Sequence, residues 1–242
     1  MQTSSTMSQA FAPTGTLRAS INLGNALLAN LDPQTQQPFG ISIDLAHELA
    51  RRLGVGVELI TFDSARNSVE AVKGEQADIG FFAIDPLRGD GITFTTPYVV
   101  IEGGYMVRED SKLQSIEEVD SAGNTIAVIK GSAYDLYLSR EIKQAEIVRA
   151  PSAPDVLRVF AAQQLDAVAG VKQMLVDEVK EHAGLRLLPG HFMEIQQAMV
   201  LPNGKGAAAA AYLCQFVQDL KANGFVREAI RRHGIQGANV AS

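Results

Sequence analysis

Apolar and polar residues follow two alternating periods along most of this chain. Residues 17–23 alternate apolar and polar side chains, which predicts a half-buried strand. Between Ile41 and Leu53 an apolar residue recurs every four positions, the spacing of one helix face, and Gly54 ends the pattern. The same reasoning predicts strands near 55–59, 77–84, 125–129, 146–148 and 165–170, and helices near 64–73, 133–142, 152–164, 207–223 and 225–233.

Strands that alternate with helices predict an α/β fold. Two extended stretches, 98–108 and 195–201, interrupt this alternation, and we interpret them as crossings between two lobes. Lobe 1 is then formed by 15–100 and 200–242, and lobe 2 by 105–195. Ligands of such sheets collect at the carboxyl ends of the strands, so we expect the binding site in a cleft between the lobes.

The N-terminal residues 1–14 are mostly polar or small, with neither a charged start nor an apolar run. We therefore expect them to be disordered, and they do not resemble an intact signal peptide. If a signal peptide has been removed, the protein is periplasmic; if none was made, it is cytoplasmic. The sequence leaves both possibilities open.

Composition excludes several classes of function. Hydrophobic residues make up 46% of the 242 residues, and the net charge of -6 is spread along the chain, which argues against non-specific nucleic-acid binding. No apolar run approaches the roughly 20 residues of a membrane span. The histidines are scattered and Cys214 is the only cysteine, so we predict no metal and no cofactor.

The clearest chemical signal is the segment 77–88, a buried strand that runs into the turn Asp85-Pro86-Leu87-Arg88. A second strand then ends at Thr96-Pro97-Tyr98. An arginine held just past a strand end suits a small carboxylate, because its planar fork can bind both oxygens. The alternative is an ordinary surface arginine.

Several motifs together resemble the type 2 periplasmic solute-binding proteins, specifically the amino-acid-binding family 3. Residues 40–54, Gly-Ile-Ser-Ile-Asp-Leu-Ala-His-Glu-Leu-Ala-Arg-Arg-Leu-Gly, are similar to a helix motif of that family. The turn 86–88, the segments 94–98 and 129–133, and Gly224-Phe225 match further motifs in the same order. The resemblance covers about residues 15–234.

The resemblance implies two lobes joined by a two-segment hinge, which close on a small ligand. In the family, the arginine of the proline turn binds the ligand carboxylate, a position held here by Arg88. A hydroxyl residue in the second lobe assists beside a helix N-terminus, which corresponds to Ser132. Backbone N–H groups of Gly131 and Ala133 would complete the anion site.

This sequence departs from the family pattern where a ligand ammonium is usually bound. The family commonly has an aspartate near Val171 or Lys172, and this stretch has no acid. Lys172 beside the strand end at Gly170 would repel an ammonium, which favours an anionic ligand over an ordinary amino acid. Alternatively, Asp85 takes over the ammonium, although it could simply cap its turn.

Three further residues complete the candidate site. The aromatic residue that the family places in its first loop is missing, and Asn25 is offered instead. Ala83 lies at the end of the strand before Arg88. Of Gln196 and Gln197 on the return crossing, one should face the cleft, and Gln197 is included without a basis to separate them.

We therefore expect a monomeric, non-enzymatic protein that captures a small anionic or zwitterionic ligand for an ABC permease. Cyclohexadienyl dehydratases resemble the same family, so an enzyme with Asp85 or Lys172 as proton donor is the first alternative. A ligand-sensing module that acts with a signalling partner is the second.

Overall fold

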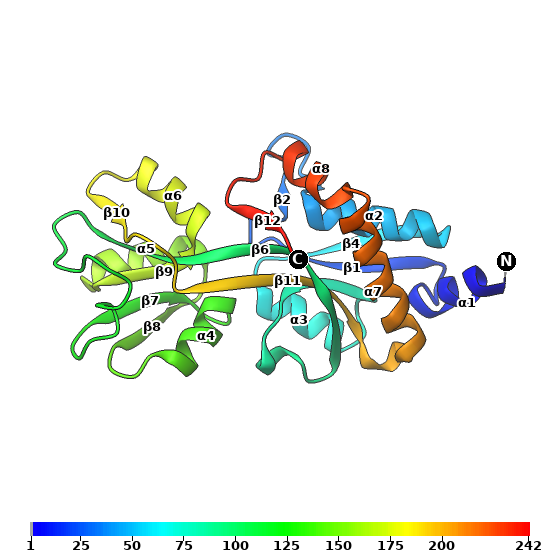
Figure 1. Ribbon diagram of the computed structural model, residues 1–242, viewed down its shortest axis with the longest axis horizontal. Helices are drawn as coiled ribbons and strands as arrows, with labels where there is room; N and C mark the ends of the chain where they lie inside the picture. Colours follow the sequence, from blue (N-terminus) through cyan, green and yellow to red (C-terminus); the bar gives the residue numbers. More distant parts are fainter. Residues whose placement is uncertain (1) are drawn as a thin grey trace. The chain divides into compact units, whose positions relative to one another are not determined.

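The computed structural model describes residues 2–242, with side chains from residue 6 onward. It divides into two compact units, the first formed by residues 1–100 and 196–242 and the second by 101–195. The chain passes between them in two long strands, β6 (Ile92–Arg108) and β11 (Met193–Pro202) (Figure 1). These strands contain the two stretches that the sequence marks as crossings.

The sheet of the first unit has the strand order β4-β1-β5-β11. β1 (Thr16–Asn22) pairs in parallel with β4 (Gly56–Phe62) and β5 (Ile79–Ala83), while β11 pairs antiparallel with β5. The residues of β5 are all buried, as expected for a strand inside a sheet with both faces covered. The carboxyl ends of β1 and β5 therefore lie at one edge of the sheet.

Helices surround this sheet at the positions that apolar spacing predicts. The residue before helix α2 (Ile41–Leu53) is Gly40. Its φ is +124°, and an added Cβ would lie 2.4 Å from the carbonyl oxygen of Leu28, so only glycine fits there. The helix ends at Gly54, whose left-handed conformation closes it. Besides the N-terminal α1 (Gln2–Phe11), the α-helices of this unit are α2 (Ile41–Leu53), α3 (Ala65–Lys73), α7 (Gly206–Ala222) and α8 (Phe225–Arg232).

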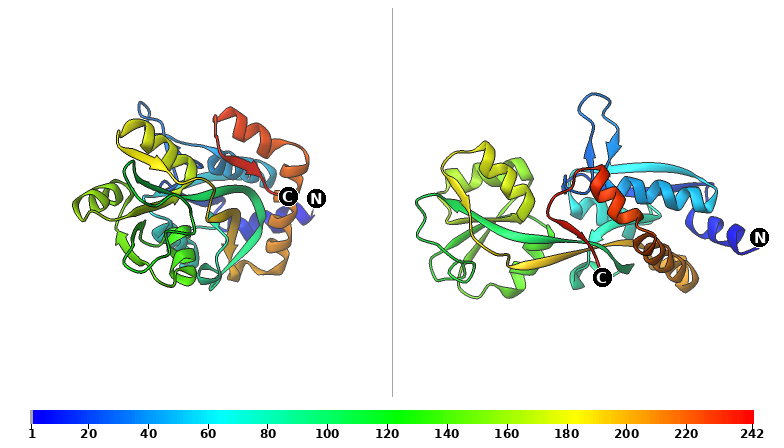
Figure 2. Two further views of the ribbon diagram at one scale, coloured as in Figure 1. Left: turned by 60° about the vertical axis from the view of Figure 1, so that its left-hand side comes forward. Right: turned by 45° about the horizontal axis from the view of Figure 1, so that its top comes forward.

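Smaller elements complete the first unit. The strands β2 (Asn30–Leu31) and β3 (Pro38–Phe39) form a hairpin that stands out from it (Figure 2). Two short 3-10 helices, η1 (Pro86–Arg88) and η2 (Asn203–Lys205), and the strand β12 (Ala238–Val240) lie at turns and near the C-terminus.

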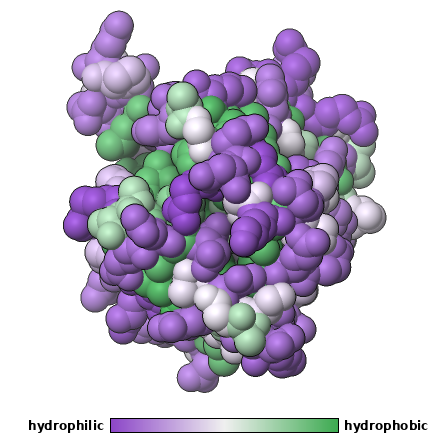
Figure 3. All heavy atoms as spheres, turned by 90° about the vertical axis from the view of Figure 1, so that its left-hand side faces the viewer, coloured by the Kyte–Doolittle hydropathy of each residue, from purple (hydrophilic) through white to green (hydrophobic). Residues whose placement is uncertain are grey.

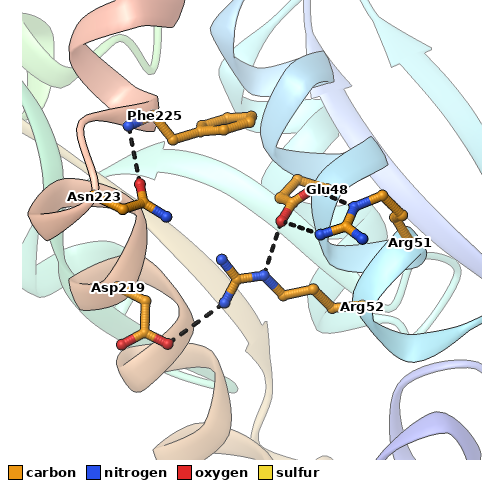
Figure 4. Close-up of polar contacts among 6 residues, drawn as sticks. All are labelled: Glu48, Arg51, Arg52, Asp219, Asn223 and Phe225. Carbon is orange, nitrogen blue, oxygen red and sulfur yellow. Dashed lines mark hydrogen bonds and ion pairs between the residues drawn. The ribbon is translucent and has the colours of Figure 1, made fainter.

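Polar contacts tie α2 to α7. Glu48 accepts hydrogen bonds from Arg51 at 2.7 Å and from Arg52 at 2.9 Å (Figure 4). The bonds from Arg51 and then Arg52 lower the pKa of Glu48 to about 2. Arg52 also reaches Asp219 on α7 at 3.4 Å and lies over the ring of Phe216. The charged side of α2 is thus part of a helix–helix contact.

The N-terminus differs from the expected disorder. Residues Gln2–Phe11 form the helix α1, and Phe11 is fully buried with its ring centroid 5.8 Å from that of Tyr212. The hydroxyl of Ser8 donates to the carbonyl oxygen of Leu53. The N-terminal segment is ordered by the burial of the Phe11 ring and by the hydrogen bond from Ser8. Its composition alone had indicated disorder. Met1 lies outside the described residues.

In the part of the sheet that belongs to the second unit, β9 lies between β6 and β7. β7 pairs in parallel with both β8 and β9, and β9 pairs antiparallel with β6. Met106, Phe160 and Val168 belong to the apolar core of this unit. Its other elements are β7 (Thr125–Ile129), α4 (Ala133–Glu141), β8 (Glu146–Ala150), α5 (Ala153–Ala162), β9 (Ala167–Val171), α6 (Lys172–Glu181) and β10 (Leu185–Leu187).

The helix α6 was not predicted from the sequence. It begins at Lys172 directly after the strand β9, and no side chain caps its first turn. Without an N-cap residue or an intervening loop, the sequence carries no start signal there. As a result, Lys172 is the first residue of a helix rather than the last of a strand.

One face of the molecule is largely polar. On the face shown in Figure 3, most side chains are hydrophilic, with apolar ones visible between them. Within residues 2–242, no helix has the length and apolar character that a membrane crossing requires.

A buried ion cluster holds the start of β5. The side chain of Asp78 is 0% exposed and accepts bonds from Nε and Nη2 of Arg18, each at 3.0 Å, and from Nζ of Lys205 at 2.6 Å. Burial alone would raise the pKa of Asp78, but the bonds from Arg18 and Lys205 outweigh it and hold the pKa below its usual value. Asp78 thereby links β1, β5 and the approach to α7.

We predict that Asp78→Asn lowers the free energy of unfolding by about 3–5 kcal/mol, because it leaves two partly buried cations without their anion. Urea denaturation at neutral pH measures this change. Asp177→Asn, which breaks an exposed pair with Lys180, is the control and should cost about 0–1 kcal/mol.

The contribution of Asp78 to stability should decrease as the pH falls. Because the folded pKa of Asp78 is lowered, its stabilisation is complete above the unfolded carboxyl pKa of about 4 and is lost as the pH falls through the folded value. The gap in stability between wild type and Asp78→Asn should therefore narrow in acid. A variant as stable as the control at neutral pH would contradict the role given to this cluster.

Candidate functional site

The turn after β5 carries the two charged residues singled out from the sequence. Asp85 is buried, and its Oδ1 accepts a hydrogen bond from the backbone N–H of Leu87 at 2.8 Å. It is therefore the N-cap of the 3-10 helix η1, which is the capping role that the sequence left open beside ligand binding. A carboxylate in this position fixes the geometry of the turn.

Arg88 is buried rather than on the surface. It is 6% exposed, and its Nη1 donates to the carbonyl oxygen of Ala83 at 3.3 Å. Burial lowers the pKa of Arg88 to about 10, while the charge of Asp85 acts in the opposite direction. The guanidinium is thus charged at neutral pH but has lost most of its hydration, a state in which a second anion is strongly favoured.

Two more of the expected residues lie beside this turn. Gln197 on β11 is paired with Ala83 on β5, and it is buried, whereas Gln196 is exposed. The backbone N–H of Ile84 donates to the carbonyl oxygen of Gln196 at 2.8 Å. The first unit therefore brings Ala83, Asp85, Arg88 and Gln197 together at one edge of the sheet.

Asn25 lies at the same edge, in the turn that follows β1. Its carbonyl oxygen accepts the N–H groups of Leu28 and Ala29. Its side-chain Oδ1 is buried and has no hydrogen-bond partner among the described residues. A buried acceptor of this kind calls for a donor such as a water or a ligand N–H.

In the second unit, the turn after β7 holds the predicted anion site. The hydroxyl of Ser132 accepts from the N–H of Asp135 at 3.1 Å, so Ser132 is the N-cap of α4. The N–H of Ser132 donates to the carbonyl oxygen of Ile129, and that of Gly131 donates to Oδ2 of Asp135 at 2.8 Å. The N–H groups of Gly131 and Ser132 therefore already donate hydrogen bonds within the unit. Ala133, whose N–H was also expected to bind an anion, is the first residue of α4.

Asp135 is a residue that the sequence analysis missed. It is buried and also accepts a hydrogen bond from Nε of Arg149 at 2.9 Å. The spacing Ser132-x-x-Asp135 is a helix-start signature and could have identified it. Asp135 supplies an internal carboxylate to the turn on which the resemblance placed ligand binding.

An acid does lie beside Lys172, although none is near it in the sequence. Nζ of Lys172 donates to Oε2 of Glu102 on β6 at 2.7 Å, and Nδ1 of His191 lies 3.4 Å from Oε1 of the same carboxylate. The bond from Lys172 lowers the pKa of Glu102. A carboxylate from a distant strand therefore opposes the charge of Lys172, and neither Glu102 nor His191 carries a sequence signal.

Gly170 occupies a packing position. A Cβ at Gly170 would lie 3.0 Å from Cδ2 of Leu175, so α6 packs closely on the end of β9 at this point. Among the described side chains, only Glu178, Glu181 and His182 bring three potential metal ligands together, on the outer side of α6. None of the expected ligand-binding residues belongs to that group.

Comparisons of the sequence with known proteins identify a family and individual relatives. The model of the bacterial extracellular solute-binding proteins, family 3, matches residues 28–235. The chain is 27% identical over 137 residues to the virulence sensor protein BvgS of Bordetella pertussis, covering 56% of the chain and 11% of the sensor. It is 22% identical over 148 residues to an arginine-binding periplasmic protein of Mannheimia haemolytica, covering 60% of the chain and 59% of that protein.

A solved structure shows the same fold. The amino acid ABC transporter substrate-binding protein AbpA of Streptococcus pneumoniae, bound to L-arginine, superposes with a TM-score of 0.78 at 21% identity. The match covers 93% of this chain and 96% of that one. This likeness confirms the predicted α/β fold of the type II periplasmic binding proteins.

We predict that Asp135→Asn loosens the turn 130–133, because the amide of Gly131 exchanges a carboxylate acceptor for a weaker one and Arg149 loses its partner. The free energy of unfolding should fall by about 1–3 kcal/mol. Amide hydrogen exchange at Gly131 should accelerate, while Glu228→Gln, in an exposed pair with Arg231, leaves it unchanged. Equal exchange rates in wild type and Asp135→Asn would show that Asp135 does not hold this turn.

Proposed function

This chain belongs to the bacterial extracellular solute-binding proteins, family 3, and we propose that it captures a small carboxylate-bearing solute through Arg88. The family consists of binding proteins rather than enzymes. The observation that carries the proposal is the burial of the Arg88 guanidinium at the carboxyl edge of β1 and β5. That edge is where open α/β sheets bind their ligands.

The physical argument rests on the poor hydration of this cation. A guanidinium in a low-dielectric environment interacts more strongly with an anion than one in water does. Its planar fork can donate to both oxygens of a carboxylate at once. Asp85 and the carbonyl oxygen of Ala83 hold the turn and the side chain in place, so little ordering is left for the ligand to induce.

The balance of charges supports a zwitterionic ligand. Lys172 suggested a strongly anionic solute, but its pairing with Glu102 removes that argument. Arg88 similarly has Asp85 as a charged neighbour. With both cations offset, a ligand that carries one carboxylate and one ammonium leaves the site close to neutral. The curated arginine-binding protein among the relatives points to the same class, the amino acids.

We also propose the setting in which binding occurs. The family description places its members outside the cell membrane, and the match to AbpA suggests delivery to an ABC permease. The protein would act as a monomer in the periplasm, with its units closing on the solute. Radius of gyration and molecular mass from small-angle scattering, with and without solute, test closure and the monomeric state.

A sensor module is the second candidate, and the similarity to BvgS favours it. The chain spans about a tenth of that sensor's length, so the likeness concerns a binding segment only. The same solute chemistry would then control a signalling partner instead of a permease. Identification of the gene product that the liganded chain contacts, by crosslinking in its native host, distinguishes the two.

Calorimetric titration with amino acids, dicarboxylates and 2-oxo acids tests the proposed function. We predict that Arg88→Ala weakens binding of the best ligand at least about 30-fold, because truncating one partner of a buried charge pair costs about 2–5 kcal/mol. The affinity of Arg88→Lys should lie between those of the wild type and Arg88→Ala, since lysine keeps the positive charge but lacks the planar, two-pronged guanidinium.

Arg231→Ala removes an exposed arginine on α8 and serves as the matched control, with unchanged affinity expected. Melting curves establish that each variant is folded before titration. Binding by a folded Arg88→Ala protein that equals the wild type would refute the proposal. Turnover of prephenate or arogenate would show an enzyme instead.

A further inference from the structure

The second unit holds a charged group that its own stability does not require. Lys172 and Glu102 form an ion pair at 2.7 Å, and their side chains are 34% and 37% exposed. Half-exposed pairs of long side chains contribute little to folding, because water competes for both charges. The position of this pair therefore needs an explanation other than stability.

The backbone under the pair is adapted to it. Gly103 and Gly104 follow Glu102 in the middle of β6, where glycine weakens a strand. A Cβ at Gly104 would lie 3.3 Å from Cγ of Lys172, and one at Gly103 would lie 2.8 Å from Cγ of Met193. The missing side chain at Gly104 lets the stem of Lys172 lie against the strand, within reach of Glu102.

Strand register places Glu102 beside the end of β9. Gly103 is paired with Val171 and Gly104 with Gly170, so the residue before Gly103, Glu102, is adjacent to the first residue of α6. Because β7 and β9 are parallel, the turn at Ser132 and the residue Lys172 follow strand ends at the same edge of this sheet. Glu102 thus supplies, from a neighbouring strand, an acid at the edge where the sequence has none.

We propose that Glu102 is the residue that selects ligands with a cationic nitrogen, and that Lys172 is its resident counter-ion, which the ligand ammonium replaces. This inference rests on the proposed function and specifies its ligand class. The exchange leaves the net charge around the Glu102 carboxylate unchanged, because the ammonium of Lys172 leaves and the ammonium of the ligand takes its place. A weak, half-exposed pair loses little when it opens.

The carboxylate retains capacity for such a ligand. A carboxylate offers about four acceptor positions. In Glu102, Oε2 accepts from Lys172 and Oε1 lies 3.4 Å from His191. A ligand ammonium can therefore first join the carboxylate and then displace Lys172, so that the anion is never left without a partner.

Matched ligand pairs test this assignment on the full chain. Each of the common L-amino acids is titrated calorimetrically against its des-amino analogue, which keeps the carboxylate and side chain but lacks the α-ammonium. The wild type should prefer the amine-bearing member. Glu102→Gln should reduce that preference roughly tenfold or more, with less than about a twofold change for the des-amino member.

Lys172→Met supplies an independent readout. Removing the competing cation while keeping an apolar stem of similar length should tighten binding of the amine-bearing member several-fold. Asp177→Asn, which alters an exposed pair on the same helix, is the control and should change neither ligand series.

The outcomes separate this inference from the proposed function. If the wild type binds solutes and binding depends on Arg88, but the preference for the amine is the same in Glu102→Gln, then only the role of Glu102 is overturned. A Lys172→Met protein that binds amine-bearing ligands more weakly also overturns it. A wild type that binds only dicarboxylates or 2-oxo acids overturns the role of Glu102 alone, and one that binds no solute of any of these classes overturns both proposals.

Discussion

The burial of one arginine side chain is the main electrostatic constraint on the first unit. Arg88 is almost fully buried at the end of a strand that is itself buried throughout. Such a cation is costly unless negative charge is near it. Asp85 and the carbonyl oxygen of Ala83 supply negative charge beside it, and our proposal is that a solute carboxylate joins them.

The rest of the first unit keeps this turn in place. Asp78 anchors the start of β5 to β1 and to Lys205, so both ends of the strand are fixed by a carboxylate. At the far end Asp85 caps the turn from which Arg88 projects. Two aspartates therefore fix the two ends of this strand, and the capping role of Asp85 is compatible with a contact to a solute.

The second unit distributes its charges differently. Asp135 is buried and bonds within its own turn, whereas Glu102 on β6 and Lys172 at the start of α6 are partly exposed. Buried pairs resist change, while exposed pairs can be exchanged at little cost. The pair that we propose to exchange with a ligand ammonium is therefore the exposed one, Glu102 and Lys172.

Much of this fold could be predicted from the chain, for identifiable reasons. Four-residue apolar spacing and Gly54 located α2, and the Asp85-Pro86 turn located Arg88, because both signals are local in sequence. Contacts between distant segments could not be predicted. Glu102 and Lys172 are separated by 70 positions and meet only because β6 pairs with β9. The helix α1 depends on the contact of Phe11 with Tyr212, which composition does not reveal.

A crystal structure of the chain with its preferred amino acid bound tests the central claim most directly. We predict that both carboxylate oxygens of the solute lie within hydrogen-bond distance of the Arg88 guanidinium. A bound solute whose carboxylate is held by other groups, with Arg88 contacting only protein atoms, would contradict it.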